Sequence, residues 1–338
     1  MTNDFEGTRL QLYLEKTGLA TPAPLAVTPI AGGQSNPTYF VTSGERRMVL
    51  RKKPAGPTLP SAHAIDREYR IMHALAITGV PVPAMLSYCD DASVIGTPFY
   101  MMERLEGRIF HDSALPDLQR EERKAIYVAM AQTLAQLHSV DWTSLDLSDY
   151  GRRGNYFARQ VGRWSKQWSL SKTRELASID FLIKWLNENI PQDETTTIVH
   201  GDFRLGNLMF HPTEPRVIGV LDWELSTLGH PLADLAHSAM IWRSSPQEYG
   251  GILGLDLDKL GIPALQTYYA AYQQAGGRPG LSTFHLAFAL FRFAVIFEGI
   301  GARAREGNAA GDNAAEVGPL AERFAARAVE VIRTSDIL

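Results

Sequence analysis

The order of apolar and polar residues predicts a strand-rich N-terminal region. Two short apolar segments, TYFVT and RMVLR, are rich in residues that favour strands, and the residues TSGER between them are typical of a hairpin turn. Apolar residues at helical spacing (Ile65, Tyr69, Met72 and Ala76) predict a helix whose buried side is bordered by Glu68. The expected strands lie in 38–42, 47–51, 80–89 and 97–107, and the expected helices span 8–18 and 62–78.

Beyond Gly107 the pattern becomes mostly helical, with one β-rich interruption at residues 196–224. Helical periodicity runs through 118–139, 172–189, 263–275 and 282–299. We therefore expect an α+β fold with a small β-rich domain at residues 1–105 and a large, mainly helical domain at residues 106–338.

Composition is that of an ordinary soluble protein, with 45% hydrophobic and 21% charged residues in a chain of 338. The formal net charge of -4 gives no basic field, so we expect no nucleic-acid or acidic-membrane partner. The single cysteine, Cys89, excludes an internal disulfide and a cysteine-based zinc site, and it fits a reducing cytoplasm.

Two segments bear on membranes and targeting. The acidic N-terminus does not read as a signal peptide, so we expect a cytoplasmic protein. The apolar segment 284–302 is interrupted by His285, Arg292 and Glu298, which predicts a buried helix rather than a membrane span. The oligomeric state cannot be read from the sequence.

The β-rich interruption carries the candidate chemistry. Asp202 and Asn207 lie in one loop after a short apolar run, and Asp222 ends the apolar run VIGVL. Phosphoryl transfer from ATP needs one carboxylate to orient the attacking hydroxyl and oxygen ligands for Mg²⁺. We assign Asp202 as catalytic base, and Asn207 and Asp222 as metal ligands. The alternative is that these residues cap turns, as Asp and Asn often do.

This segment resembles the aminoglycoside phosphotransferase and choline kinase group, relatives of the protein kinases. His200, Gly201, Asp202 and Asn207 match the loop H-x-D-x-x-x-x-N, and Asp222 in LDWE matches the aspartate of D-F-G. The resemblance implies a bilobal protein-kinase-like fold with ATP and Mg²⁺ as cofactors. The Glu in place of the final Gly argues against a protein kinase. GTP stays open as the donor.

The resemblance also implies a nucleotide site in the N-terminal domain. Arg51 closes the strand that carries the phosphate-binding cation, with the adjacent Lys52 as the alternative, and Glu68 is its expected partner. Ser35 and Asn36 fall where a phosphate-covering loop would lie, although an ordinary hairpin turn fits equally well. By the same analogy, the backbone of Glu103 and Leu105 would meet adenine, and Met102 would line its pocket.

Further positions receive supporting roles. By resemblance, Asp234 in GHPLADLAH braces the catalytic loop, and His200 orients it. Arg204 could reach an acidic group of the substrate or face solvent. The candidates for an acceptor pocket in the helical half are Asn155, Tyr156, Arg159, Arg163 and Trp164.

Five segments narrow the resemblance to the kinase-type domains fused to acyl-CoA dehydrogenases: VLRKKP, LPSAHAIDREYR, TGVPVP, LGIPALQTYYAAY and GARAREGNAA. This implies a small-molecule hydroxyl substrate, such as a hydroxyacyl-CoA. We expect no dehydrogenase domain within 338 residues. An Arg-bearing or apolar pocket would favour such a substrate, whereas an acidic pocket would favour an aminoglycoside or choline.

Two other functions remain open at this stage. One is a catalytically silent kinase fold that binds nucleotide or a partner. The other is a metal-dependent hydrolase, suggested by His111-Asp112, although no histidine spacing supports a cluster. The chain lacks G-x-x-x-x-G-K-[ST] and G-x-S-x-G, which excludes the ordinary phosphate-loop NTPases and the common hydrolase elbow.

Overall fold

The computed structural model describes residues 5–30, 36–56, 63–305 and 317–335. The chain divides into two compact units, Met1–Gly107 with Ile218–Glu224, and Arg108–Val217 with Leu225–Leu338. The short segment Ile218–Glu224 thus groups with the N-terminal unit, although it lies inside the range 106–338 expected for the second domain.

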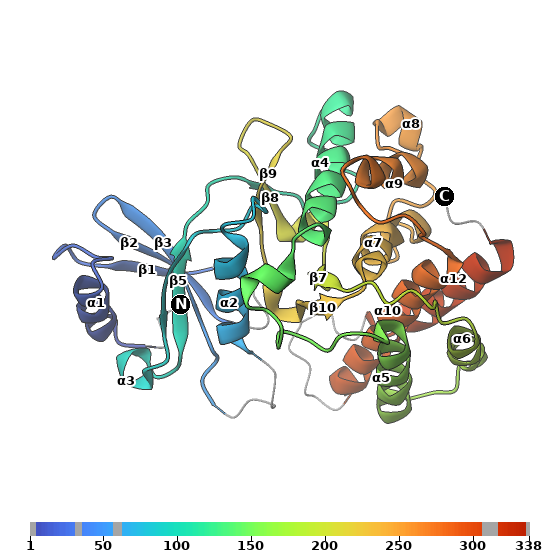
Figure 1. The fold of residues 1–338 in the computed structure, drawn as a ribbon, viewed down its shortest axis with the longest axis horizontal. Coiled ribbons are helices and arrows are strands. Elements are labelled where there is room, and N and C mark those ends of the chain that lie inside the picture. The colour runs from blue at the N-terminus through green and yellow to red at the C-terminus, as the bar shows by residue number, and fades with distance from the viewer. Residues whose placement is uncertain (1–4, 31–35, 57–62, 306–316, 336–338) are drawn as a thin grey trace. The chain divides into compact units, whose positions relative to one another are not determined.

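The N-terminal unit is built on a five-stranded antiparallel sheet with the strand order β1-β2-β3-β5-β4 (Figure 1). The predicted hairpin is confirmed, with Thr38 of β2 opposite Arg51 of β3. Its strands are β1 (Ala26–Pro29), β2 (Thr38–Ser43), β3 (Arg46–Lys52), β4 (Met85–Cys89) and β5 (Phe99–Glu103). Its helices are α1 (Gly7–Lys16), α2 (Ile65–Leu75) and α3 (Ala92–Ile95).

Strand alternation places apolar side chains on one face of this sheet and polar side chains on the other. Met48 and Leu50 of β3 pack with Leu10 and Leu14 of α1 in one apolar core. Residues of opposite parity, such as Arg51, point to the other face. There α2 contacts β4 and β5, and Tyr69 of α2 approaches the rings of Tyr88 and Tyr100. The polar side chains of the candidate nucleotide site therefore lie on the α2 face.

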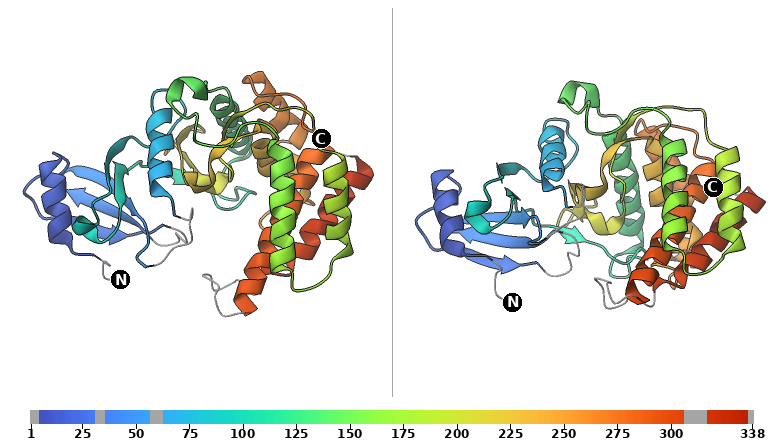
Figure 2. Two further views of the ribbon diagram at one scale, coloured as in Figure 1. Left: turned by 60° about the horizontal axis from the view of Figure 1, so that its bottom comes forward. Right: turned by 90° about the horizontal axis from the view of Figure 1, so that it is seen from below.

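The C-terminal unit is mainly helical, and the helix α10 (Thr283–Arg305) forms its core. Helix α10 packs against α5, α6, α7 and α12, which lie beside it in the turned views (Figure 2). It is long and apolar enough to cross a membrane, but 83% of its most apolar window is buried inside the protein. The long helices are α4 (Arg120–His138), α5 (Tyr156–Ser171), α6 (Ala177–Glu188), α7 (Pro231–Ala239), α9 (Leu265–Gln274), α10 and α12 (Leu320–Thr334).

Short elements flank or contain the candidate catalytic residues: Asp202 lies between β7 and η2, Asn207 ends η2, and Asp222 lies between β9 and η3. Strand β7 pairs with β10 in antiparallel register, with Thr197 opposite Gly229, so α7 begins just after the end of β10 that lies beside the start of β7. The short elements are β6 (Arg108–Ile109), η1 (Trp142–Leu145), β7 (Thr197–Val199), η2 (Leu205–Asn207), β8 (Leu208–Phe210), β9 (Val217–Val220), η3 (Trp223–Leu225), β10 (Thr227–Gly229), η4 (Met240–Arg243) and α8 (Leu257–Leu260).

Candidate active site

The loop after β7 is held by Asp234 from the first turn of α7. Its Oδ2 accepts the backbone N–H of His200 at 2.5 Å, and its Oδ1 accepts that of Gly201 at 2.8 Å. His138 of α4 lies 3.5 Å from Oδ2 through its Nε2, and its Nδ1 is 2.8 Å from the Tyr272 hydroxyl. Asp234 is 2% exposed, so these contacts are what make its burial tolerable. Asp234 thus braces the loop, as the sequence suggests.

Gly201 meets two demands that other residues cannot satisfy together. Its φ is +84°, and an added Cβ would lie 2.7 Å from the carbonyl oxygen of Leu225. Gly254 has almost the same φ of +86°, but an added Cβ there meets nothing within 4 Å. The two glycines therefore separate the effect of backbone strain from the effect of a steric clash.

We expect Gly201→Ala to lower the free energy of unfolding by about 3 kcal/mol, against about 1–2 kcal/mol for Gly254→Ala. Urea unfolding of the two variants checks this. Equal losses would mean that the loop shifts without penalty and that Leu225 does not confine it.

Asp202 is surrounded by hydrogen-bond donors. Oδ2 accepts the Asn207 amide N–H at 2.8 Å and lies 3.3 Å from Nε of Arg204. Oδ1 lies 3.0 Å from Nε2 of His237 on α7. Asn207 also donates to the backbone carbonyl of Asp202 at 2.9 Å. The carboxylate is therefore fixed in orientation, with 24% of the side chain exposed.

The surroundings of Asp202 keep it ionised. Burial by itself would raise its pKa, but the hydrogen bond from His237 and the charge of Arg204 lower the pKa below its ordinary value. An ionised carboxylate with a fixed direction can orient a hydroxyl group and receive its proton.

A second polar cluster lies on the α2 face of the N-terminal unit. Nε of Arg51 is 2.8 Å from Oε2 of Glu68, and the hydroxyl of Tyr100 donates to the same oxygen at 3.1 Å. Nη2 of Arg51 lies 3.1 Å from Oδ1 of Asp222. Burial would lower the pKa of Arg51, but Glu68 and the other nearby acidic groups raise it above its usual value. The structure thus brings together four residues that are distant in sequence.

Asp222 and Asn207 each present an oxygen suited to a hard cation. Asp222 has a φ of +64°, an uncommon conformation for a residue other than glycine, and its side chain is 39% exposed. The Asn207 amide uses its nitrogen for the bonds to Asp202, which leaves its oxygen as a ligand atom. The two residues belong to different units of the chain.

The other residues expected to contact the nucleotide differ in whether their polar groups are free to bind a ligand. Ser35 lies outside the described residues. Asn36 is fully buried, and its amide is engaged by Glu68 at 2.7 Å and by His63 at 3.0 Å, so it organises Glu68 instead of facing a ligand. The N–H of Glu103 donates to the carbonyl of Ala84 at 2.8 Å. Met102 and Leu105 are half-buried at the end of β5 and just beyond it.

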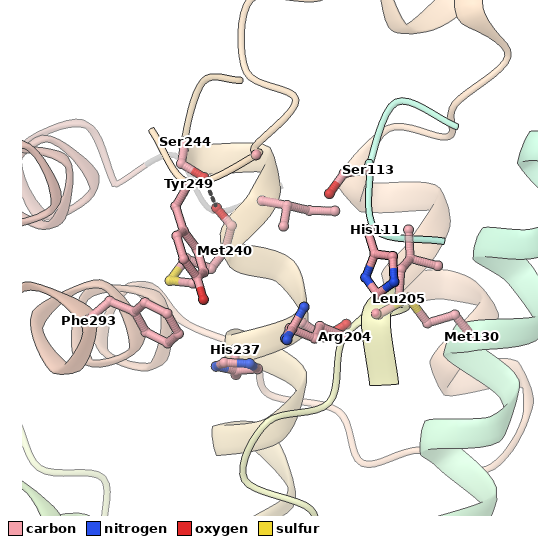
Figure 3. Close-up of a pocket in the computed structure, with 14 residues that line it drawn as sticks. His111, Ser113, Met130, Arg204, Leu205, His237, Met240, Ser244, Tyr249 and Phe293 are labelled. Carbon is pink, nitrogen blue, oxygen red and sulfur yellow. Dashed lines mark hydrogen bonds between the residues drawn. The ribbon is translucent and has the colours of Figure 1, made fainter. Parts of the chain in front are cut away.

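A pocket of about 70 Å³ lies beside the Asp202 loop in the C-terminal unit (Figure 3). Arg204 and His237, which both contact Asp202, are part of its wall. The other lining residues are His111, Ser113, Met130, Leu205, Gly206, Ser238, Met240, Ile241, Ser244, Tyr249, Gly250 and Phe293.

The five acceptor candidates, Asn155 just before α5 and four residues on α5, do not line this pocket. Arg159 donates instead to the carbonyls of Arg152 and Arg153, and the guanidinium of Arg292 lies over the ring of Trp164. These side chains thus support the packing and the loop before α5.

Sequence reasoning missed His237 and Tyr249. His237 stands three residues after Asp234, and positions three apart share one face of a helix, so its approach to the same loop was implicit in GHPLADLAH. Tyr249 has a φ of +67°, and its loop is held by Glu248, which pairs with Arg327 of α12 at 3.2 Å. No local sequence pattern predicts the contact between Glu248 and Arg327.

Comparison with known proteins supports the fold and identifies related proteins. The model of a phosphotransferase enzyme family matches residues 26–285. Acyl-CoA dehydrogenase family member 10 of Mus musculus is 45% identical over 321 residues, which cover 94% of this chain and 30% of the mouse protein. The chain thus spans about a third of the length of this relative.

Solved structures extend the comparison. A proposed aminoglycoside phosphotransferase of Ralstonia eutropha is 43% identical with a TM-score of 0.90, covering 98% of this chain and 100% of that one. The aminoglycoside phosphotransferase APH(4)-Ia, solved in ternary complex with AMP-PNP and hygromycin B, is 16% identical with a TM-score of 0.61, covering 95% and 98%. The expected α+β phosphotransferase fold is confirmed, and so is the resemblance to domains of acyl-CoA dehydrogenase family members.

Proposed function

Because the chain belongs to the phosphotransferase enzyme family, we propose that it transfers the γ-phosphoryl group of ATP to a hydroxyl group of a small molecule. The observation that carries this proposal is the Asp202 carboxylate, which is ionised, partly exposed and fixed by donors in an H-G-D-x-x-x-x-N loop. An aspartate that only caps a turn would not need these three side-chain donors around its carboxylate.

In the proposed reaction, Asp202 orients the acceptor hydroxyl and receives its proton. The hydroxyl oxygen bonds to the γ-phosphorus as the bond from that phosphorus to the β–γ bridging oxygen breaks, and ADP leaves. The protein contributes mainly position and charge, because the transition state of phosphoryl transfer is loose.

Asn207 and Asp222 are the proposed magnesium ligands. One amide oxygen and one carboxylate fit the preference of Mg²⁺ for hard oxygen donors, which is usually completed by phosphate oxygens and water. Among the described residues, no cluster of three His, Cys, Asp or Glu side chains could hold a metal without such help. When bound, the ion would neutralise phosphate charge.

Arg51 is the proposed cation for the nucleotide phosphates, with Glu68 orienting it. Lys52, the alternative, points to the opposite face of β3 by strand alternation; it is 1% exposed, with its Nζ 5.4 Å from the centroid of the Phe5 ring. This supports Arg51, which faces the acidic cluster of the α2 side.

The lining of the pocket beside Asp202 supports an anionic or neutral acceptor. It contains Arg204, two histidines and several apolar side chains, and among its described lining residues there is neither Asp nor Glu. A polycationic aminoglycoside would gain no carboxylate partner there. A hydroxyacyl-CoA or a related hydroxy acid is the acceptor class that fits this lining, and the relative named as an acyl-CoA dehydrogenase family member is consistent with it.

We expect ATP consumption with hydroxyacyl-CoA esters or hydroxy acids and little with aminoglycosides or choline, because only the first group complements Arg204. A coupled ADP assay over such a panel, with mass spectrometry of the product, checks this. Asp202→Ala protein is the control for contaminating kinases. Turnover of the cationic acceptors alone would overturn the acceptor class, and failure to bind ATP would overturn the phosphotransferase proposal.

A further inference from the structure

The two carboxylate oxygens of Asp202 have unequal surroundings. Oδ2 has two neighbouring donors, Asn207 and Arg204. Among the described residues, His237 is the one donor that reaches Oδ1. Each oxygen of an ionised carboxylate has about two acceptor positions. Oδ2 is therefore saturated, whereas Oδ1 keeps one open position.

The ring of His237 is held firmly from several sides. It is 4% exposed, and its centroid lies 5.3 Å from that of Phe293 on α10. In the close-up it lies between Phe293 and Arg204 (Figure 3). Its helix α7 is anchored to the same loop by Asp234, one turn earlier. The group that contacts Oδ1 is thus a packed, immobile ring.

The geometry also selects one tautomer. Nε2 is the His237 nitrogen that faces Oδ1 of Asp202, at 3.0 Å, and a proton on Nε2 makes the hydrogen bond to this oxygen. Nδ1 is buried and has no hydrogen-bond partner among the described residues, so a proton placed there would be an unsatisfied donor. The neutral ring protonated at Nε2 meets both conditions.

We propose that His237 is a positioning residue for phosphoryl transfer and that Oδ1 of Asp202 is the oxygen that receives the acceptor hydroxyl. This inference rests on the proposed function. His237 occupies one acceptor position of Oδ1 and thereby directs the other toward the acceptor. Arg204 and His237, which each contact one oxygen of Asp202, both line the adjacent pocket, so the groups that hold this carboxylate are part of the pocket wall.

Loss of this hydrogen bond frees the carboxylate to rotate. A misplacement of about 1 Å can lower a rate by about 10²-fold. We therefore expect His237→Leu to lower kcat by about 10- to 100-fold while the KM for ATP stays near its original value. His237→Gln should restore most of the rate, because its amide nitrogen can occupy the place of Nε2, whereas the shorter His237→Asn should not.

The activity test uses ATP hydrolysis with water as the acceptor, which requires no knowledge of the natural substrate. Melting temperatures of all variants are measured in parallel. The matched control is His285→Gln, which removes another buried histidine that does not touch Asp202 and is expected to keep the rate. Equal rates for the Leu and Gln variants at equal stability would overturn the positioning role.

A second measurement separates failure of this inference from failure of the proposed function. Nitrogen-15 NMR of histidine-labelled protein, with His237→Gln for assignment, reports which ring nitrogen carries the proton. We expect the Nε2–H tautomer in the unmodified protein and a perturbed signal in Asp202→Ala. A proton on Nδ1 alone would overturn the inference even in an active enzyme. A protein that does not bind ATP would refute the proposed function and with it the positioning role.

Discussion

Asp202→Ala is expected to lower kcat by about 10²–10⁴-fold, the usual contribution of a general base. The reason is local, because Asp202 is the carboxylate that the loop fixes with Asn207, Arg204 and His237. ATP binding should persist, since the proposed phosphate cation Arg51 lies in the other unit and does not depend on Asp202. Turnover by coupled assay and ATP affinity by calorimetry check the two halves of this expectation.

The control for this experiment is Asp180→Ala, which removes an exposed aspartate from the same unit. It should leave both turnover and affinity unchanged. Removing Asp202 leaves three donors, on Asn207, Arg204 and His237, without this carboxylate partner, so a moderate fall in melting temperature is expected as well. Full turnover by Asp202→Ala would contradict the assignment of the base.

The second large effect is expected at Asp222. Asp222→Ala should weaken the binding of magnesium-ATP by about 10- to 100-fold, because it removes a charged partner worth about 1.5–3 kcal/mol. ATP binding measured in EDTA should change much less. The comparison of the two titrations distinguishes loss of a metal ligand from general damage to the nucleotide site.

Asp222→Asn is the variant that keeps the backbone intact. Asn tolerates a positive φ better than Ala, so it suits the φ of +64° at this position. It should retain stability but lose the magnesium-dependent gain in affinity. The exposed Asp90 supplies the control substitution Asp90→Ala in the same unit. An unchanged affinity in Asp222→Asn would show that the ion is held elsewhere.

Local patterns predicted the strands and long helices well. The β2–β3 hairpin, α4, α9 and α10 appear where alternation or helical periodicity indicated, because each has one clearly apolar face or is apolar throughout. Helices α5, α7 and α12 were not predicted. The choice between Arg51 and Lys52 could not be made locally, because adjacent strand residues point to opposite faces and only the packing of α2 identifies the polar one.

The site residues divide in the same way, into those that a local motif predicts and those that depend on tertiary packing. Asp202, Asn207 and Asp222 were recognisable because a loop motif fixes their spacing. Asn36 was expected near phosphate but is buried against Glu68, a contact between residues 32 positions apart. His237 and Tyr249 reach the loop region through tertiary packing of α7, α10 and α12. Such contacts depend on how helices are arranged in space, which a periodic pattern does not encode.

The return of Ile218–Glu224 to the N-terminal unit has a practical consequence for dissecting the protein. The chain passes between the units after Gly107, after Val217 and again after Glu224. A fragment that stops at Gly107 would lack the hydrogen bond from Val220 to the carbonyl of Pro81, and it would lack Asp222 itself. Cutting the chain at one position therefore cannot yield either unit intact. Recombination with related enzymes must exchange the segment Ile218–Glu224 together with the first 107 residues.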